Sequence, residues 1–250
     1  MFYKYFPGYA KPLDLRDFYQ GCTLVLIGGS PAIKKENIDR VLPGAPVYTM
    51  AMNNAAVTYK PDLWVGGDRP ECYSPDILHD PSIIKFAGVG RRRDDCHGKL
   101  WYSIPNTIFY SATEKDYTIN NLFTPHKHLV WWHNTWWVAM TLAYTLGFRT
   151  ILTIGTGFTM STSGQYSYAT KLRSKEISSN NKLYDKTAQA MNDNRDLFVT
   201  QGMHIYNCTS PSILEEAYGY LPLEEAIKVE QRKIPSRDTL QRPHSRKDKL

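Results

Sequence analysis

The sequence predicts an α/β protein built on a Rossmann-like, doubly wound, mostly parallel sheet. Three observations support this prediction: short apolar runs alternate with helix-compatible stretches, the runs are apolar throughout, and each ends in glycine or a small polar residue. A continuous apolar run closed by glycine is typical of a strand buried on both faces of a parallel sheet. The 250 residues, 42% hydrophobic and 22% charged, suffice for one sizeable domain with appendages.

The predicted elements follow one another in order. The first strand covers residues 23–27 and ends in the turn Gly28–Pro31, and residues 34–41 are then compatible with a helix. Further strands are predicted at residues 46–50, 62–66, 82–86, 150–154 and 203–206. The best helix is predicted at residues 135–146, where apolar residues recur at a spacing of three or four and Gly147 follows as a C-cap.

Three parts flank or interrupt this alternation. Residues 1–21 are predicted to form an N-terminal extension, and residues 22–227 the Rossmann-like nucleotide-donor-binding domain. Within that domain the polar stretch at about 159–194 is predicted to be a lid, with a helix at 181–192. Residues 228–250 are predicted to be a disordered basic tail.

The net charge of +6 is concentrated in that tail. Residues 228–250 contain eight Lys or Arg against three Asp or Glu, a net charge of +5, so the rest of the chain is nearly neutral. A body that binds nucleic acid through a broad basic face is therefore not expected. The tail itself is suited to attract an anionic polymer such as DNA.

The spacing of the cysteines and the apolar segments indicate the cellular compartment of the protein. The four cysteines show no CxxC spacing, which favours reduced, buried thiols over a zinc site. Residues 1–12 lack the apolar stretch of a secretory signal, and together these features predict a cytoplasmic protein. Residues 129–148 have the length of a membrane span, but His133-Asn134-Thr135 interrupts them, so a core helix is favoured over stable membrane insertion.

The strand ends supply the candidate site. In doubly wound sheets ligands bind beyond the carboxyl ends of the strands, which places Gly28–Ser30, Asn53–Asn54, Asp68, Gly155–Gly157 and residues 207–210 around one crevice. The glycines of the first turn let a phosphate approach the backbone, and a helix N-terminus favours anions; a plain tight turn is the competing interpretation. Asn53 and Asn54 either bind a ribose or base edge or form a turn.

Charged and aromatic residues add further candidates. The carboxylate of Asp68 is suited to hold a metal or orient a hydroxyl, and Arg69 to bind phosphate or pair with Asp68. His133, near the start of the best helix, is a candidate general base, against packing as the commoner role of a lone histidine. Tyr166 in the predicted lid either stacks on a base or belongs to a surface loop.

Taken together, four segments resemble known glycosyltransferases. Residues 24–32, LVLIGGSPA, are similar to the opening strand and glycine turn of bacterial sialyltransferases and of the motility-accessory glycosyltransferases, a family that also includes archaeal hydroxymethylpterin diphosphokinases. Residues 60–68, KPDLWVGGD, resemble a segment of the motility-accessory family. Residues 133–158 resemble the central helix–strand–glycine unit of both groups, and residues 206–214 their closing strand and turn. The resemblance covers roughly residues 22–215.

The resemblance implies a domain that binds an activated nucleotide donor. By position, Gly28, Gly29 and Ser30 would meet the donor phosphates, Asn53, Asn54 and Asp68 would address the nucleoside or a metal such as Mg²⁺ or Mn²⁺, and Thr135 with Gly155, Thr156 and Gly157 would border the donor pocket. The sequence departs from the family in two places. No Asp follows two residues after Gly155, and residues 159–202 contain no histidine to act as base, which leaves Asp68 or His133.

The sequence thus predicts an enzyme, a glycosyltransferase that moves a sugar from a nucleotide-sugar donor to a hydroxyl acceptor. The acceptor would be a hydroxylated base in DNA, attracted by the basic tail, or a glycan. Two alternatives stay open. One is an ATP-dependent diphosphokinase acting on a small heterocycle, and the other is a non-catalytic nucleotide-binding module. The oligomeric state is not predicted.

Overall fold

The computed structural model describes residues 2–35, 38–113, 118–124, 128–132, 134–161, 166–168 and 172–233. Within these ranges nine strands form one sheet in the order β11-β10-β3-β4-β5-β6-β7-β1-β2. Neighbouring pairs from β11 to β7 are parallel, whereas β1 and β2 are antiparallel. The α/β class and the mostly parallel sheet are therefore confirmed. The strands are β1 (Phe2–Phe6), β2 (Tyr9–Leu13), β3 (Thr23–Ile27), β4 (Val47–Met52), β5 (Leu63–Gly66), β6 (Ile84–Gly88), β7 (Thr107–Tyr110), β10 (Thr150–Ile154) and β11 (His204–Asn207).

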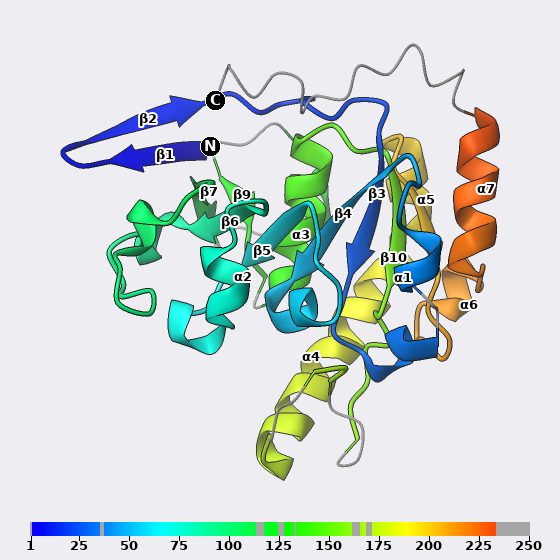
Figure 1. Ribbon diagram of the computed structural model, residues 1–250. Coiled ribbons are helices and arrows are strands. Elements are labelled where there is room, and N and C mark those ends of the chain that lie inside the picture. The colour runs from blue at the N-terminus through cyan, green and yellow to red at the C-terminus, as the bar shows by residue number, and fades with distance from the viewer. Residues whose placement is uncertain are drawn as a thin grey trace.

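Helices cover both faces of this sheet (Figure 1). On one face lie α1 (Ile38–Val41), α2 (Pro75–His79) and α7 (Leu223–Lys233), and on the other α3 (Thr135–Thr145), α4 (Ser174–Asp193) and α5 (Arg195–Thr200). The side chains of β3 alternate between the two cores and are fully buried. The remaining elements are α6 (Glu215–Tyr218), the small parallel pair β8 (Ala112–Thr113) and β9 (Leu129–Val130), and the 3₁₀ helices η1 (Pro31–Lys35), η2 (Asn53–Val57), η3 (Pro70–Cys72), η4 (Val89–Arg91), η5 (Trp101–Ser103) and η6 (Ile119–Leu122).

Helix α3 is the central helix that the sequence predicts. Its residues from Thr135 to Ala143 are all buried, as expected for a helix that is apolar all round. Asn134 caps its start by accepting a hydrogen bond from the Trp137 N–H at 3.2 Å. At its end Gly147 adopts φ 97°, and a Cβ there would lie 2.7 Å from the Asp17 backbone. Among the described residues no helix is long and apolar enough to cross a membrane.

The sequence-based expectations differ from the structure at both ends of the chain and in the lid. Residues 2–13 of the predicted extension form a hairpin that joins the sheet, because β1 pairs with β7, a strand that the sequence analysis missed. Helix α4 begins at Ser174, seven residues before the predicted helix. Helix α7 runs to Lys233, so the range predicted as a disordered tail starts as a helix; residues 234–250 lie outside the described residues.

The order of the strands locates the switch point. From β3 the chain adds β4, β5, β6 and β7 on one side, and then returns to place β10 and β11 on the other side of β3. The connection that leaves β3 runs to β4, and the connection that leaves β10 runs to β11 on the opposite side, so the two diverge at the carboxyl ends of β3 and β10. This divergence opens a crevice where ligands bind in doubly wound sheets.

Buried tyrosines give the fold a dependence on alkaline pH. Burial raises the pKa of the hydroxyls of Tyr19, Tyr73, Tyr110, Tyr168 and Tyr218. In the unfolded chain these groups lose their protons near pH 10, and in the folded chain only at higher pH. Their contribution to stability is full below about pH 10 and is lost as the pH rises, by up to about 1.4 kcal/mol per pH unit and tyrosine.

We therefore expect the free energy of unfolding, measured in urea, to fall steeply between about pH 10 and pH 12. Absorbance at 295 nm should show these tyrosines ionising together with the loss of the far-ultraviolet circular dichroism signal. Ionisation of all 17 tyrosines near pH 10 with the helical signal intact would contradict this expectation.

Candidate functional site

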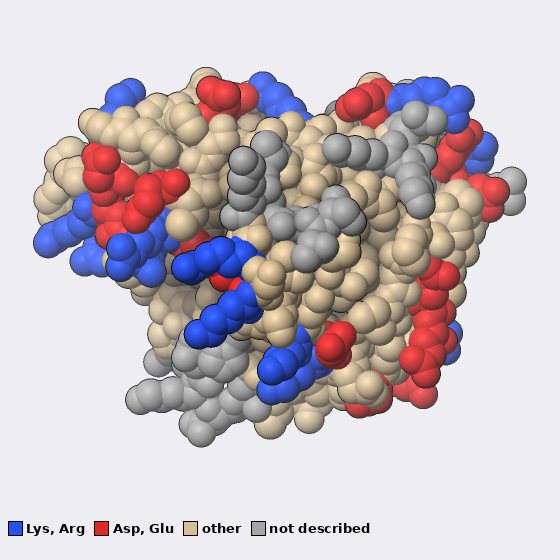
Figure 2. Space-filling model, turned by 90° about the horizontal axis from the view of Figure 1, so that it is seen from below, with Lys and Arg blue, Asp and Glu red and all other residues tan. Residues whose placement is uncertain are grey.

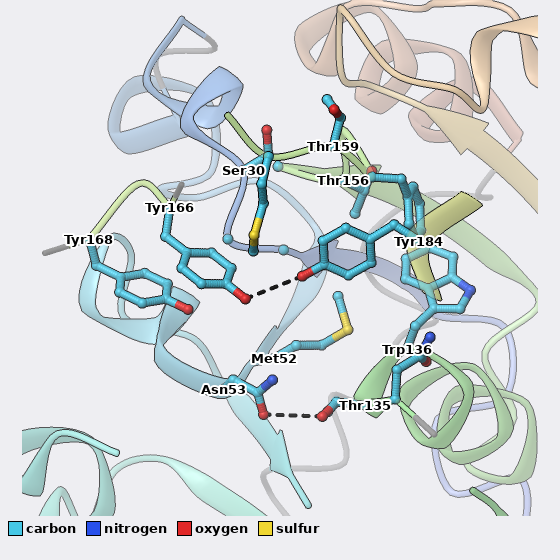
Figure 3. A pocket seen from close by; sticks show the side chains of 16 residues that line it. Ser30, Met52, Asn53, Thr135, Trp136, Thr156, Thr159, Tyr166, Tyr168 and Tyr184 are labelled. Carbon is cyan, nitrogen blue, oxygen red and sulfur yellow. Dashed lines mark hydrogen bonds between the residues drawn. The ribbon is translucent and has the colours of Figure 1, made fainter. Parts of the chain in front are cut away.

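A pocket opens at the switch point, where β3, β4 and β10 end (Figure 3). Its cavity volume is about 120 Å³, smaller than the roughly 300–1,000 Å³ of pockets that enclose a whole drug-sized ligand. Its walls come from the turn after β3, the end of β4, the start of α3, the loop after β10, residues 166–168 and α4. They are lined by Gly28, Gly29, Ser30, Met52, Asn53, Asn134, Thr135, Trp136, Gly155, Thr156, Phe158, Thr159, Met160, Tyr166, Tyr168 and Tyr184.

Eight of the residues that the sequence predicts for the site meet in this pocket. They come from segments up to 138 positions apart, and the fold brings them together. They are Gly28, Gly29, Ser30, Asn53, Thr135, Gly155, Thr156 and Tyr166.

Other predicted residues lie outside the lining. The Asn54 side chain bridges the loop after β5 instead, donating to the Cys72 carbonyl at 2.8 Å and accepting from the Ser74 N–H at 3.0 Å. Arg69 is exposed and lies 3.8 Å from the Glu71 carboxylate. At Gly157 a Cβ would lie 2.8 Å from Ser30 Oγ, so this glycine permits a close approach of two loops rather than facing the pocket. His133 lies outside the described residues.

Asp68 lies close to the pocket without lining it. Its side chain is exposed, and its N–H donates to the Tyr73 hydroxyl at 2.7 Å. Its negative charge adds to burial in raising the pKa of Tyr166. Among the described residues no three His, Cys, Asp or Glu side chains gather as ligands for a metal ion, so Asp68 has no such partners for a metal there. Its roles as base or metal ligand stay predictions.

The glycine turn after β3 is held against β10 rather than left open to an anion. The Gly28 N–H donates to the Ile154 carbonyl at 2.7 Å, and the Ser30 N–H donates to the Gly155 carbonyl at 2.8 Å. Pro31 has no N–H, and the Ala32 N–H donates to Ser30 Oγ at 3.3 Å. Since η1 has only five residues, a long helix does not begin here. A phosphate at this turn would meet the Gly29 N–H, not the helix N-terminus that the sequence suggested.

Asn53 is a polar side chain of the pocket whose orientation is fixed by its neighbours. Its backbone has φ 52°, a conformation that asparagine tolerates better than most residues. Its side-chain Oδ1 accepts hydrogen bonds from the Thr135 hydroxyl at 3.2 Å and from the Tyr73 hydroxyl at 3.3 Å. Because Oδ1 is held by two donors, Nδ2 faces the cavity near Met52 (Figure 3). The pocket thus presents an oriented amide donor to a ligand.

Aromatic rings form the opposite wall. Tyr166 and Tyr168 stack with ring centroids 4.8 Å apart, and the hydroxyls of Tyr166 and Tyr184 are hydrogen-bonded at 3.2 Å (Figure 3). The Ser167 N–H donates to the Gly29 carbonyl at 2.8 Å and fixes this segment over the glycine turn. A Cβ at Gly29 would come within 2.9 Å of Tyr166, so glycine is needed for this contact.

The lining residues carry no charged side chain. Burial raises the pKa of the hydroxyls of Tyr166, Tyr168 and Tyr184. These phenols therefore stay protonated at neutral pH and act as neutral donors. A pocket with aromatic walls, a few hydroxyls and one oriented amide fits a flat, polar, uncharged group such as a nucleobase better than a free anion.

Several residues that line the pocket were not predicted from the sequence. Met52 and Asn134 adjoin predicted residues, and Trp136 and Phe158 pack edge to face at 5.0 Å. Tyr184 is half-buried and follows the helical spacing of the buried residues Ile177, Ala188 and Met191 of α4. That helical spacing was the sequence signal that could have identified Tyr184.

The surface around the carboxyl edge has no uniform charge. Figure 2, seen from below the view of Figure 1, shows Lys and Arg side chains in separate groups, with Asp and Glu gathered along one side. In this view of the described residues no broad basic face is present. The nearly neutral body that the sequence predicts agrees with this distribution.

Comparisons with known proteins yield matches to solved structures alone. No family model and no curated protein matches the chain. The sialyltransferase CstII from Campylobacter jejuni, solved with the substrate analogue CMP-3FNeuAc, is 11% identical, with a TM-score of 0.45 over 82% of this chain and 88% of its own. A MAf glycosyltransferase from Magnetospirillum magneticum is 14% identical, with a TM-score of 0.49 over 86% of this chain and 37% of its own.

Proposed function

We propose that this protein is a glycosyltransferase that binds a nucleotide-sugar donor in the pocket at the ends of β3, β4 and β10. The oriented amide of Asn53 is the observation that carries the proposal. An amide N–H that is fixed inside an uncharged aromatic pocket can donate a hydrogen bond to the carbonyl oxygen or ring nitrogen of a base, or to a ribose hydroxyl. The assignment of glycosyl transfer, rather than another use of a nucleotide, rests on the resemblance of residues 22–215 to glycosyltransferases.

The proposed reaction is substitution at the anomeric carbon of the donor sugar. The oxygen of an acceptor hydroxyl forms a bond to that carbon, while the bond from the carbon to the phosphate oxygen of the nucleotide breaks. The electron pair of the broken bond leaves with the phosphate, and the hydroxyl proton passes to a base. Asp68, whose charge acts on Tyr166 of the pocket, and His133 are the candidates for that base.

The negative charge that develops on the leaving phosphate needs hydrogen-bond donors. The hydroxyls of Tyr166 and Tyr184, which are hydrogen-bonded to each other and together keep one free O–H, suit this role with the Gly29 N–H. Donors of this kind act strongly when they are fixed and shielded from water. An ion such as Mg²⁺ or Mn²⁺ would supply charge neutralisation if the donor phosphates brought it, and Asp68 is its candidate ligand.

Removing one of these hydroxyls tests the proposed role. Tyr184→Phe takes away the partner of the Tyr166 hydroxyl without changing the ring. We expect kcat to fall about tenfold or more, because loss of one such donor costs on the order of 10²–10³ in well-studied cases. Steady-state kinetics would measure the change in kcat, with the nucleotide-sugar donor that gives the largest thermal shift as substrate. Tyr206→Phe, outside the pocket lining, is the matched control, and equal kcat values for the two variants would contradict the role.

The acceptor is proposed from charge alone. The tail at 228–250 suits an anionic polymer, DNA with a hydroxylated base or an acidic glycan, and such attraction weakens as salt is raised. We expect deletion of residues 234–250, which spares helix α7, to weaken binding to DNA at low salt and to leave hydrolysis of the donor unchanged. Equal DNA binding by the shortened chain would overturn the role of the tail.

A thermal-shift panel of CMP, UMP, ATP and nucleotide sugars, each with and without Mg²⁺ or Mn²⁺, tests the proposal. A nucleotide present at 100 times its Kd stabilises the native state by about 2.7 kcal/mol, or roughly 5–10 °C for a chain of this size. A shift with a pyrimidine nucleotide sugar supports the proposal. A shift with ATP alone would favour the diphosphokinase alternative, and binding without turnover the non-catalytic module.

A further inference from the structure

The hairpin β1–β2 stands apart from the pocket and from the proposed chemistry. Only Phe2 and Tyr3 of β1 pair with β7, and among the described strands β2 pairs with β1 alone. The hairpin therefore projects beyond the body of the protein, with its turn at Pro7–Gly8 (Figure 1). Strand β2 is exposed over most of its length. Tyr5 holds one face of the hairpin to the body, with its ring packed edge to face on Phe109 at 5.4 Å, so the other face is the one left for a partner.

One face of the hairpin carries aromatic rings at the tip and basic side chains behind them. Phe6 and Tyr9 lie opposite each other on either side of the turn, and their rings stack with centroids 4.8 Å apart and planes 11° apart. Tyr9 is 60% exposed. Lys4 and Lys11 form the cross-strand pair two positions further back, on the same face because side chains alternate along a strand. The Lys4 ammonium accordingly lies 5.9 Å from the centre of the Phe6 ring.

The two lysines are not neutralised within the described part of the protein. Like charges directly opposite each other destabilise an antiparallel pair, and no acidic side chain in the described ranges forms an ion pair with Lys4 or Lys11. The acidic residue next to this arm, Asp14, is already held by Arg16 at 2.6 Å. The lysine pair therefore carries a positive charge that the described residues leave available to an anionic partner.

We propose that this hairpin docks the protein on the surface of an anionic lipid bilayer. Phe6 and Tyr9 enter the headgroup region, and Lys4 and Lys11 bind lipid phosphates. A strand rises about 3.4 Å per residue, so the lysines lie about 7 Å behind the aromatic pair. That distance matches the ~5–10 Å to which interfacial segments bury their apolar side chains. Aromatic and basic side chains are the ones enriched at this boundary.

Other partners fit this face less well. Bases of a single nucleic-acid strand stack on open aromatic faces, whereas Phe6 and Tyr9 each cover one face of the other. Pairing with a strand of a second molecule is opposed by Pro12, the fourth of the five residues of β2, which has no N–H to offer at the edge. A lipid surface requires neither open ring faces nor backbone donors.

The test uses a tryptophan placed at the tip, in the full-length protein. Tyr9→Trp adds a fluorophore at an exposed position, and its emission is read as the difference from the unmodified chain. Vesicles contain phosphatidylcholine with 30% phosphatidylserine, with or without brominated acyl chains. We expect a blue shift of this emission and its quenching by brominated lipid, and neither with pure phosphatidylcholine. The Tyr9→Trp chain without residues 234–250 separates docking by the hairpin from binding by the basic tail, and its quenching should persist.

Charge variants complete the test. Lys4→Glu with Lys11→Glu in the Tyr9→Trp chain should lower partitioning to the anionic vesicles about tenfold or more. The same exchange at Lys99 and Lys186, exposed residues outside the hairpin, should leave the quenching unchanged. Absence of quenching, or a response of the introduced tryptophan to a single-stranded oligonucleotide but not to vesicles, would overturn the proposal.

Discussion

Replacing Asn53 by Asp is expected to lower the affinity of the pocket for nucleotide by about ten- to a hundredfold. Asp keeps an oxygen to accept from Thr135 and Tyr73, and it tolerates the backbone at φ 52° as Asn does. It replaces the Nδ2 donor with a negatively charged oxygen facing the ligand. Loss of the hydrogen bond, together with an unpaired acceptor, costs about 1–3 kcal/mol, which corresponds to this change in Kd.

Isothermal titration calorimetry with the nucleotide found in the thermal-shift panel measures this effect. Asn54→Asp is the matched control, since the neighbouring side chain is engaged with Cys72 and Ser74 outside the pocket. That variant should keep the nucleotide affinity within about twofold, whatever it does to stability. If both variants bind the nucleotide as tightly as the unmodified chain, Asn53 does not donate a hydrogen bond to the ligand.

Gly155→Ala is expected to lower the free energy of unfolding by about 2–5 kcal/mol. Gly155 has φ 67°, and a Cβ there would lie 2.4 Å from the Gly28 carbonyl oxygen. The left-handed conformation costs a side chain roughly 1–2 kcal/mol, and crowding in a packed site about 1–3 kcal/mol more. The obstructing atom belongs to the backbone, so a change of rotamer cannot relieve the contact.

Urea unfolding of the two proteins at pH 7 gives the difference directly. Gly90→Ala serves as control, because a Cβ at Gly90 has no atom within 4 Å and its φ is not in the left-handed range. A loss of less than about 0.5 kcal/mol at Gly155 would show that β3 and β10 separate easily at their ends. The pocket would then lack the rigid base on which the proposed donor site rests.

The positions of most strands could be predicted from the sequence, whereas their pairing in the sheet could not. The run Thr23–Ile27 is recognisable because it is apolar throughout and closed by glycine. Strand β7, Thr107–Tyr110, was missed because it is followed by Ser111 and Ala112 rather than by glycine. The hairpin at residues 2–13 was missed because its aromatic and polar residues do not form a buried run, and only pairing with β7 adds it to the sheet.

The hydrogen bonds of the site could not be predicted from local sequence patterns either. Asn53 and Asn54 are equivalent in sequence, but Thr135 and Tyr73 hold the first in the pocket, whereas the second is bound to the loop after β5. The glycine turn predicted an anion site, but the N–H groups of Gly28 and Ser30 donate to backbone carbonyls at the end of β10. Such assignments depend on partners 18 to 126 residues away, which local patterns do not specify.

A crystal structure with the bound nucleotide tests the central claim most directly. The account predicts that the base or ribose lies between Asn53 and the rings of Tyr166 and Tyr168, with a polar atom within hydrogen-bond distance of Asn53 Nδ2 and the phosphates toward Gly29. A nucleotide bound at another surface, such as the groove between α1 and α7, with this pocket filled by water, would contradict it.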